Sequence, residues 1–429
     1  MLSKNGKRKT LIISSFITLV GSSIAMANRI EAFMISRSIT GIGFGITNAT
    51  SPLFIHEIAP KKWRAALLCI ILLWINIGFT LPLVLQFYFP RFDAPDTSSP
   101  DYCEALKGKH IIWRELEAMP IILSFIQFIA LFMVFRKENP IYRQHLECKS
   151  GSLGTSEESG ETESGINYEI QLQQSKEKSP SRIERDTWTN LWKPTERRKL
   201  IASLIIRGVG QLLGINVLLN FSILFTIGED PRYNLRFFLS AIACFHSCLA
   251  MVVHTLVKRK PLLLCGTLIC CFICSLLFQL TGNLERRGEV FLMFDGYANT
   301  ICTISLAIFG LTFIIMNATI VHVYCTDVLT DKGMSVATSG LYFFNSFTRF
   351  LPTLALNLLG WFGGETTFIN ANRVNFFMFS GFAIVGFFLI LIFVKETFNK
   401  SRAEITQEFG KEFYSNSIEI IPLKTSVNY

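Results

Sequence analysis

Charged side chains are scarce in this chain of 429 residues: only 17% are Asp, Glu, Lys or Arg, while 50% are hydrophobic. Soluble domains average about 25% charged residues. The shortage excludes an ordinary soluble domain, and the positive mean hydropathy indicates a membrane protein. The 39 phenylalanines fit helices that face lipid. The formal net charge of +9 does not indicate nucleic acid, because the basic residues stand beside apolar segments, as positive-inside loops do.

Residue patterns for chemistry are lacking as well. The sequence has no suitably spaced cluster of His, Cys and carboxylate residues and no glycine-rich phosphate loop. We therefore expect no metal, no cofactor and no enzymatic activity. Nearly all of the 11 cysteines lie inside apolar runs, where a thiol acts as a small hydrophobe, and only Cys103 falls in an expected outer loop. We also expect no signal peptide and no glycosylated outer loop.

Long apolar stretches are what the sequence does contain. About 20 apolar residues span a bilayer, and ten stretches approach this length: 10–27, 33–56, 65–89, 112–135, 201–227, 237–257, 261–281, 299–322, 334–360 and 376–394. An even number of spans puts both termini on one side, and the excess of Lys and Arg in alternate loops places that side in the cytosol. These spans predict an all-α, polytopic membrane protein.

One polar segment divides the spans. Residues 148–186 are rich in Ser, Glu and Gly, so we expect them to form the disordered part of a cytosolic linker over 136–200. The linker separates a four-span half at 1–135 from a six-span half at 201–394, and a cytosolic tail follows over 395–429.

The stretch from Ser36 to Ala66 combines an apolar helix with charges at its end. Glu57 and Arg64 flank a tight turn, and Arg8 and Lys9 stand at the same side of the preceding span. A carboxylate that faces cations from neighbouring helices can hold a bundle shut as a cytosolic gate. Interfacial anchoring is an equal alternative. Residues with a structural role in this helix are Arg37, Gly41, Gly45 and Pro52.

Acid and base recur at corresponding helix ends on both sides of the linker, as expected for a transporter built from repeats. The residues assigned to this gate and salt-bridge motif are Arg8, Lys9, Glu57, Arg64, Glu138, Arg259, Lys260, Asp327 and Glu396.

The order of the motifs resembles the sugar porter family of the major facilitator superfamily, which includes the animal facilitative glucose transporters (solute carrier family 2). The matching motifs are Gly6-Lys7-Arg8-Lys9, Ser36-Arg37 through Pro52, Glu57, Pro60 and Arg64-Ala65, Trp113-Arg114 with Pro120 and Gln127, Lys137 to Tyr142, Gln211 to Asn216, and Lys395 to Asn399. The resemblance implies a bundle of twelve helices of which the first two are absent here. A truncated gene model explains this most simply, and a real ten-span product is the alternative.

The resemblance also implies a central sugar site. Neutral amides suit a sugar because its hydroxyls are both donors and acceptors. Gln211 lies near the middle of its span, Asn216 and Asn220 follow, and Gly214 would allow local unwinding that brings the amides to one cavity. Hydrogen bonding between helices as packing glue is the alternative.

Departures from the family pattern leave the solute open. Arg207 and Gly210 replace glutamines, His322 stands near a tryptophan position, and Asn345 falls where an Asn-Trp pair is expected. If Arg207 points into the cavity, an organic anion becomes plausible. The alternative, which we favour, is that Arg207 extends to the cytosolic interface.

We interpret the chain as a facilitative carrier of a hexose or similar small polar solute, in the plasma membrane, that works by alternating access. A non-transporting sensor or scaffold, a truncated inactive product and an anion carrier that uses Arg207 remain alternatives. Expected partners are the solute and the lipid bilayer, and no nucleic acid.

Overall fold

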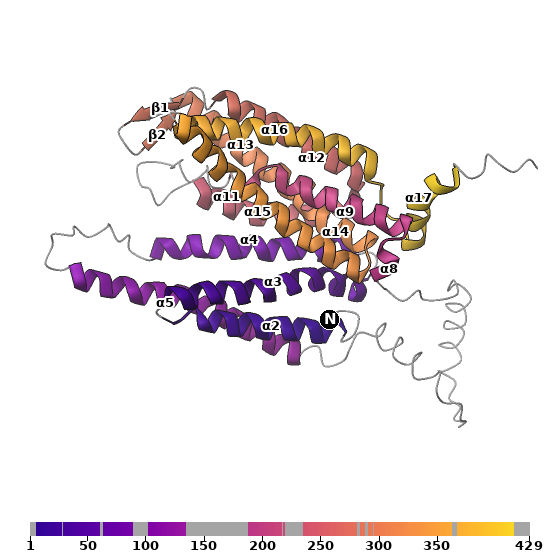
Figure 1. Ribbon diagram of the computed structural model, residues 1–429, viewed down its shortest axis with the longest axis horizontal. Helices are drawn as coiled ribbons and strands as arrows, with labels where there is room; N and C mark the ends of the chain where they lie inside the picture. The colour runs from indigo at the N-terminus through magenta and orange to yellow at the C-terminus, as the bar shows by residue number, and fades with distance from the viewer. Residues whose placement is uncertain are drawn as a thin grey trace, which may run out of the picture.

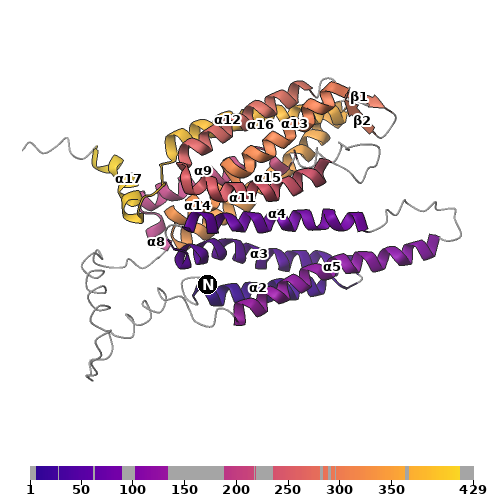
Figure 2. The same cartoon turned by 180° about the vertical axis from the view of Figure 1, so that it is seen from behind.

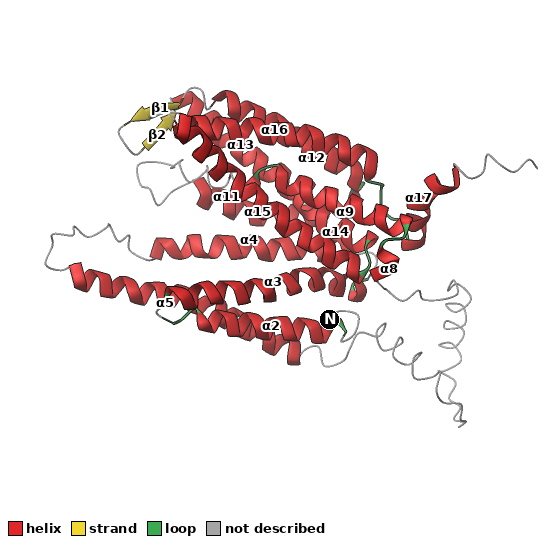
Figure 3. Ribbon diagram, in the orientation of Figure 1, coloured by secondary structure: helices red, strands yellow, loops and turns green. Residues whose placement is uncertain are grey.

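The computed structural model describes residues 6–27, 29–60, 63–88, 102–133, 188–216, 218, 235–280, 284–287, 291–294, 296–362 and 367–415. These residues form a helical bundle with one small hairpin (Figure 3). Most of the predicted linker, including its part at 148–186, lies outside the described residues.

The N-terminal helices form one group along the long axis of the molecule (Figure 1). They are α2 (Lys7–Ile24), α3 (Ile30–Ile58), α4 (Arg64–Tyr88) and α5 (Tyr102–Met133). Glycine allows α2 to approach α3 closely, since a Cβ at Gly21 would lie 2.8 Å from the backbone nitrogen of Thr40.

The C-terminal helices form a larger group. Its elements are α8 (Trp188–Leu191), α9 (Pro194–Leu212), α11 (Leu235–Leu256), α12 (Arg259–Leu280), β1 (Leu284–Arg287), β2 (Phe291–Phe294), α13 (Gly296–Thr312), the π-helix η4 (Phe313–Ala318), α14 (Thr319–Val328), α15 (Asp331–Phe362), α16 (Thr367–Phe393) and α17 (Arg402–Ser415). Strands β1 and β2 pair antiparallel, from Leu284 opposite Phe294 to Arg287 opposite Phe291. The hairpin lies at the opposite end of the bundle from α8 and α17, and we call the latter the α17 end (Figures 1 and 2).

Each of the ten predicted spans overlaps a helix. The stretch 299–322 lies in α13, η4 and α14, which follow one another without a gap. Five helical segments of the described residues are long and apolar enough to cross a membrane: Arg64–Val84, Leu239–Leu256, Arg259–Leu280, Thr300–Val328 and Val374–Phe393. The all-α membrane fold is thereby supported, while the count of ten spans stays a prediction.

Apolar side chains are found both inside the bundle and on its outside. Leu213, Leu277 and Phe379 are buried among the C-terminal helices. By contrast, Leu256 and Phe272 are 72% and 70% exposed. Water would penalise such exposure, whereas lipid tails would not, so the outside of the bundle is suited to a bilayer.

The two groups meet along α4 and α11, and α3 lies against α14 and α15 (Figures 1 and 2). The Asn76 amide of α4 donates to the Ser247 hydroxyl of α11 at 2.7 Å, and Thr80 donates to the backbone oxygen of Ser240 at 3.1 Å. Polar side chains therefore join the groups within an apolar environment.

Candidate functional site

Helix α9 is interrupted at a glycine in the interior of the C-terminal group. Gly214 has a φ of 83°, which side chains rarely adopt, and a Cβ there would lie 2.6 Å from Cγ of Phe379. Helical structure resumes at Ile215 and Asn216. The interruption places Gln211 and Asn216 on separate helical segments.

Neutral amides gather around this interruption. The side-chain nitrogen of Asn345 on α15 donates to Oε1 of Gln211 at 2.9 Å, and both side chains are half-buried. The Nδ2 group of Asn216 is buried and finds no hydrogen-bond partner within the part of the chain that the structure describes. Asn220 lies outside the described residues. The three described amides offer both donors and acceptors, which is what hydroxyl groups require.

Arg207 lies one helical turn before Gln211 and is 1% exposed, so it does not extend to an aqueous interface. Its guanidinium donates to the Cys325 sulfur at 3.3 Å, the Thr338 hydroxyl at 3.2 Å and the Met334 sulfur at 3.3 Å. The favoured interpretation of the sequence, in which Arg207 reaches the interface, is therefore wrong. Helices α14 and α15 enclose the side chain instead.

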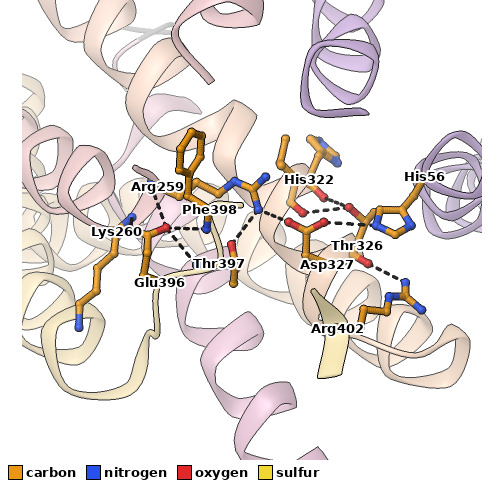
Figure 4. Close-up of polar contacts among 11 residues, drawn as sticks. His56, Arg259, Lys260, His322, Thr326, Asp327, Glu396, Thr397, Phe398 and Arg402 are labelled. Carbon is orange, nitrogen blue, oxygen red and sulfur yellow. Dashed lines mark hydrogen bonds and ion pairs between the residues drawn. The ribbon is translucent and has the colours of Figure 1, made fainter. Parts of the chain in front are cut away.

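His322 on α14 is 7% exposed, and its Nδ1 atom has no hydrogen-bond partner in the described part of the chain. Its backbone oxygen accepts a hydrogen bond from the Thr326 hydroxyl at 3.1 Å (Figure 4). The buried imidazole thus keeps one ring nitrogen available for a further contact.

A pocket of about 630 Å³ separates α2 and α3 from α15. Hydroxyl groups line much of it: Thr10, Thr50, Ser335, Thr338, Ser339 and Tyr342. Thr338 is shared, because the same hydroxyl accepts the hydrogen bond from Arg207. Next to the pocket, the Asn48 amide of α3 donates to the Tyr342 hydroxyl at 2.8 Å and joins the two groups of helices.

Asp327, at the end of α14, connects three elements (Figure 4). Its carboxylate forms an ion pair with Arg259 at the start of α12 and lies 3.2 Å from Nε2 of His56 on α3. Arg259 also donates to the Thr397 hydroxyl at 2.7 Å. This cluster therefore links the N-terminal and C-terminal helices at the α17 end.

Glu396 fixes the segment after α16 to the start of α12. Its carboxylate accepts the backbone N–H groups of Arg259 at 3.1 Å, Lys260 at 3.0 Å, Thr397 at 3.0 Å and Phe398 at 2.9 Å. Burial raises the pKa of this carboxyl, but the four N–H donors outweigh burial, and the net shift of the pKa is downward.

A second link between the groups involves Lys7 at the start of α2. Its ammonium forms an ion pair with Glu57 of α3 and lies 3.0 Å from a carboxylate oxygen of Asp331 on α15. Lys7 thus connects Glu57 of the N-terminal group of helices with Asp331 of the C-terminal group.

The family model described as "Sugar (and other) transporter" matches residues 1–409 of the chain. The chain belongs to this sugar transporter family. Its curated relatives include hexose transporter 1 of Plasmodium vivax, which is 22% identical over 92% of this chain and 76% of the relative. Facilitated glucose transporter member 7 of Mus musculus is 23% identical over 96% of this chain and 75% of the relative. The sugar transporter ERD6-like 17 of Arabidopsis thaliana is 26% identical over 93% of this chain and 77% of the relative.

Solved structures support the same fold for this sugar transporter family member. The proton:xylose symporter XylE, bound to 6-bromo-6-deoxy-D-glucose, aligns with a TM-score of 0.68 at 18% identity, covering 95% of this chain and 84% of that one. The fucose:proton symporter FucP in its outward conformation aligns with a TM-score of 0.52 at 12% identity, covering 90% of this chain and 84% of that one. The chain is thus a multi-pass membrane protein with the major facilitator fold, and not an enzyme.

The remaining predicted residues of this sugar transporter occupy varied positions. The Nε atoms of Arg8 and Arg64 are buried without a hydrogen-bond partner in the described residues, and Lys9 is exposed. Arg37 is exposed and lies 4.6 Å from the ring centroid of Phe33. Pro52 is buried inside α3, whereas a Cβ at Gly41 or Gly45 would meet no atom within 4 Å. Glu138 lies outside the described residues.

Sequence reasoning did not single out three residues of the links between the groups: Lys7, His56 and Asp331. Lys7 is the second residue of the predicted basic motif, but the motif does not tell which of its cations meets the acid. His56 directly precedes Glu57, so its position at the end of α3 was a signal that could have identified it.

Proposed function

We propose that this protein carries a sugar or a closely related polyhydroxy solute across a membrane by alternating access. The observation that carries the proposal is the Gln211–Asn345 amide pair beside an interrupted helix, with the Asn216 amide two residues beyond the interruption at Gly214. The Nδ2 group of Asn216 is buried without a hydrogen-bond partner among the described residues, so a solute hydroxyl is a suitable acceptor for it. The hexose and glucose transporters among the relatives support the same class of solute.

The proposed movement is a rocking of residues 1–135 against residues 201–394. The links made by Lys7 with Asp331 and by His56 with Asp327 join these two parts at one end of the bundle. Both links must break for that end to open. We infer that they act as the cytosolic gate, together with the ion pair of Arg259 and Asp327.

We further propose that both termini lie in the cytosol, that the membrane is the plasma membrane and that transport is facilitative. The orientation is supported by the excess of Lys and Arg in the loops of the α17 side. Uptake that stays unchanged when the proton gradient is collapsed would support facilitation over proton symport.

The proposal is tested by uptake of radiolabelled D-glucose and D-xylose into proteoliposomes that contain the full chain. We expect saturable uptake, and we expect Asn345→Ala to lower kcat/KM at least tenfold because it leaves Gln211 without its partner. Ser346→Ala is the matched control, since Ser346 is the exposed neighbour of Asn345 on the same helix.

Two results would contradict the proposal. Equal uptake by the Asn345→Ala and Ser346→Ala variants would remove Asn345 from the site. Sugar binding without any uptake by the wild-type protein would favour a non-transporting sensor over a carrier.

A further inference from the structure

Arg207 is an exception among the buried cations. Three cationic side chains are less than a tenth exposed in the described residues: Lys199, Arg207 and Arg259. Lys199 pairs with Glu196, and Arg259 pairs with Asp327. Arg207, the most buried of the three, takes part in no ion pair within the described part of the chain, and its contacts are a thiol, a hydroxyl and a thioether.

These neutral contacts compensate the charge poorly. A guanidinium remains protonated in proteins, and sulfur is a weak hydrogen-bond acceptor. A buried cation without an anion is energetically costly, so ionisable residues inside membrane proteins usually mark a functional site. The environment of Arg207 therefore points to an anionic partner that is not a side chain of the described residues.

The position of Arg207 connects it with the sugar site. Helices α9 and α15 are joined by two successive contacts: Arg207 with Thr338, and Gln211 with Asn345. Residues four apart on a helix share a face and are separated by roughly 6 Å along the axis. The guanidinium and the amides thus lie at a separation that one monosaccharide can bridge.

His322 on α14 lies three residues before Cys325, whose sulfur Arg207 contacts. Its buried Nδ1 atom has no partner in the described residues. A group that satisfied both residues would have to be polar and to accept hydrogen bonds from the guanidinium. A carboxylate meets the requirement of Arg207 through two parallel N–H···O bonds.

We propose that the solute is a sugar acid, which places hydroxyls at Gln211 and Asn345 and its carboxylate at Arg207. This inference rests on the proposed sugar transport and specifies its substrate class. The guanidinium is enclosed by α14 and α15 in this arrangement of the helices. The proposal therefore requires, besides the rocking of the two groups, a shift of α15 relative to α9 within the C-terminal group, so that the carboxylate replaces the sulfur contacts.

The test compares D-glucuronate with D-glucose, which differ in one carboxylate, in proteoliposomes that contain the full chain. We expect wild-type protein to take up glucuronate with a kcat/KM at least tenfold higher than that for glucose. Arg207→Gln should lower the ratio of glucuronate to glucose uptake at least tenfold. Arg207→Lys keeps the charge but loses the planar guanidinium group. Its ratio of glucuronate to glucose uptake should lie between that of the wild type and that of Arg207→Gln.

A measurement on the wild-type protein guards against variants that fail to fold. Glucuronate should raise the unfolding midpoint in detergent more than equal concentrations of glucose or chloride, because binding to the folded state stabilises it. Glucose uptake without glucuronate uptake would overturn the sugar-acid inference and leave sugar transport standing. Stabilisation by chloride alone would overturn it in favour of an inorganic anion at Arg207. Uptake of none of D-glucuronate, D-glucose and D-xylose would refute the proposed function itself.

Discussion

At the scale of single residues, the polar side chains of this protein are placed by partners that are far away in sequence. The sequence predicted Gln211 as a ligand of a hydroxyl, and the structure gives it a partner 134 residues away, Asn345. Residue types and spacing within a helix therefore suffice to propose an amide site. They do not determine which side chain closes it, because that depends on how α9 and α15 pack.

The basic motif of residues 6–9 illustrates the same limit. Its charge pattern predicts an ion pair with Glu57, and the pair forms through Lys7. The predicted cations Arg8 and Lys9 are placed differently, since one rotation of about 100° per residue turns each side chain to another face of α2. A motif predicts the presence of a cation at a helix end, whereas the rotation of the helix selects the residue.

Glu396 permits a prediction on pH dependence. Glu396→Gln should lower the free energy of unfolding at pH 7 by about 1–3 kcal/mol, because four N–H groups lose a charged acceptor. The folded-state pKa of Glu396 is lowered, so its stabilisation is complete above the unfolded pKa of about 4.3 and is lost as pH falls through the folded value.

Thermal unfolding in detergent between pH 7 and pH 3 provides the measurement. The difference in unfolding midpoint between the wild type and Glu396→Gln should become smaller as the solution becomes acidic. Glu31→Gln serves as the control, since it removes the same charge from an exposed position at the start of α3. A difference that stays constant over this pH range would show that the carboxylate charge is unimportant.

At the scale of the helices, apolar length predicted where elements lie but not how they are interrupted. The stretch 299–322 was predicted as one uniform span, yet it contains the π-helix η4 over Phe313–Ala318. The β1–β2 hairpin was not predicted either. A hydropathy prediction averages over about 20 residues. It cannot resolve a local change from α-helical to π-helical hydrogen bonding, which covers about a single turn.

The interruption of α9 gives a prediction at this scale. Gly214→Ala should destabilise the protein by at least 1 kcal/mol, because a side chain at positive φ is strained and its Cβ would meet the Phe379 ring at 2.6 Å. Gly381→Ala is the matched control on α16, where a Cβ meets no atom within 4 Å, and should be neutral or slightly stabilising. Unfolding midpoints in detergent compare the two, and equal midpoints would argue against a required interruption at Gly214.

At the scale of the whole molecule, the two groups of helices are joined at the α17 end by contacts that the proposed rocking movement must break. Each contact contains a charged group, so it should favour the closed end by about 1–2 kcal/mol. Such an amount changes the ratio of two conformations by a factor of about 5–30. Two contacts, Lys7 with Asp331 and His56 with Asp327, therefore suffice to bias the equilibrium strongly without locking it.

This bias can be measured as a distance distribution between the groups. Spin labels on a ketone-bearing non-canonical residue at positions 9 and 192 avoid the native cysteines; both positions are exposed, one on α2 and one just after α8.

Lys7→Met and His56→Ala should each increase the population at longer distance, and the double variant should increase it further. Glu404→Gln, which removes an exposed charge on α17, should leave the distribution unchanged. Because His56 directly precedes Glu57, the ion-pair partner of Lys7, the two sites are neighbours, and the double variant measures the coupling between them. A double variant with the wild-type distribution would mean that the α4–α11 contact, and not these links, holds the two groups together.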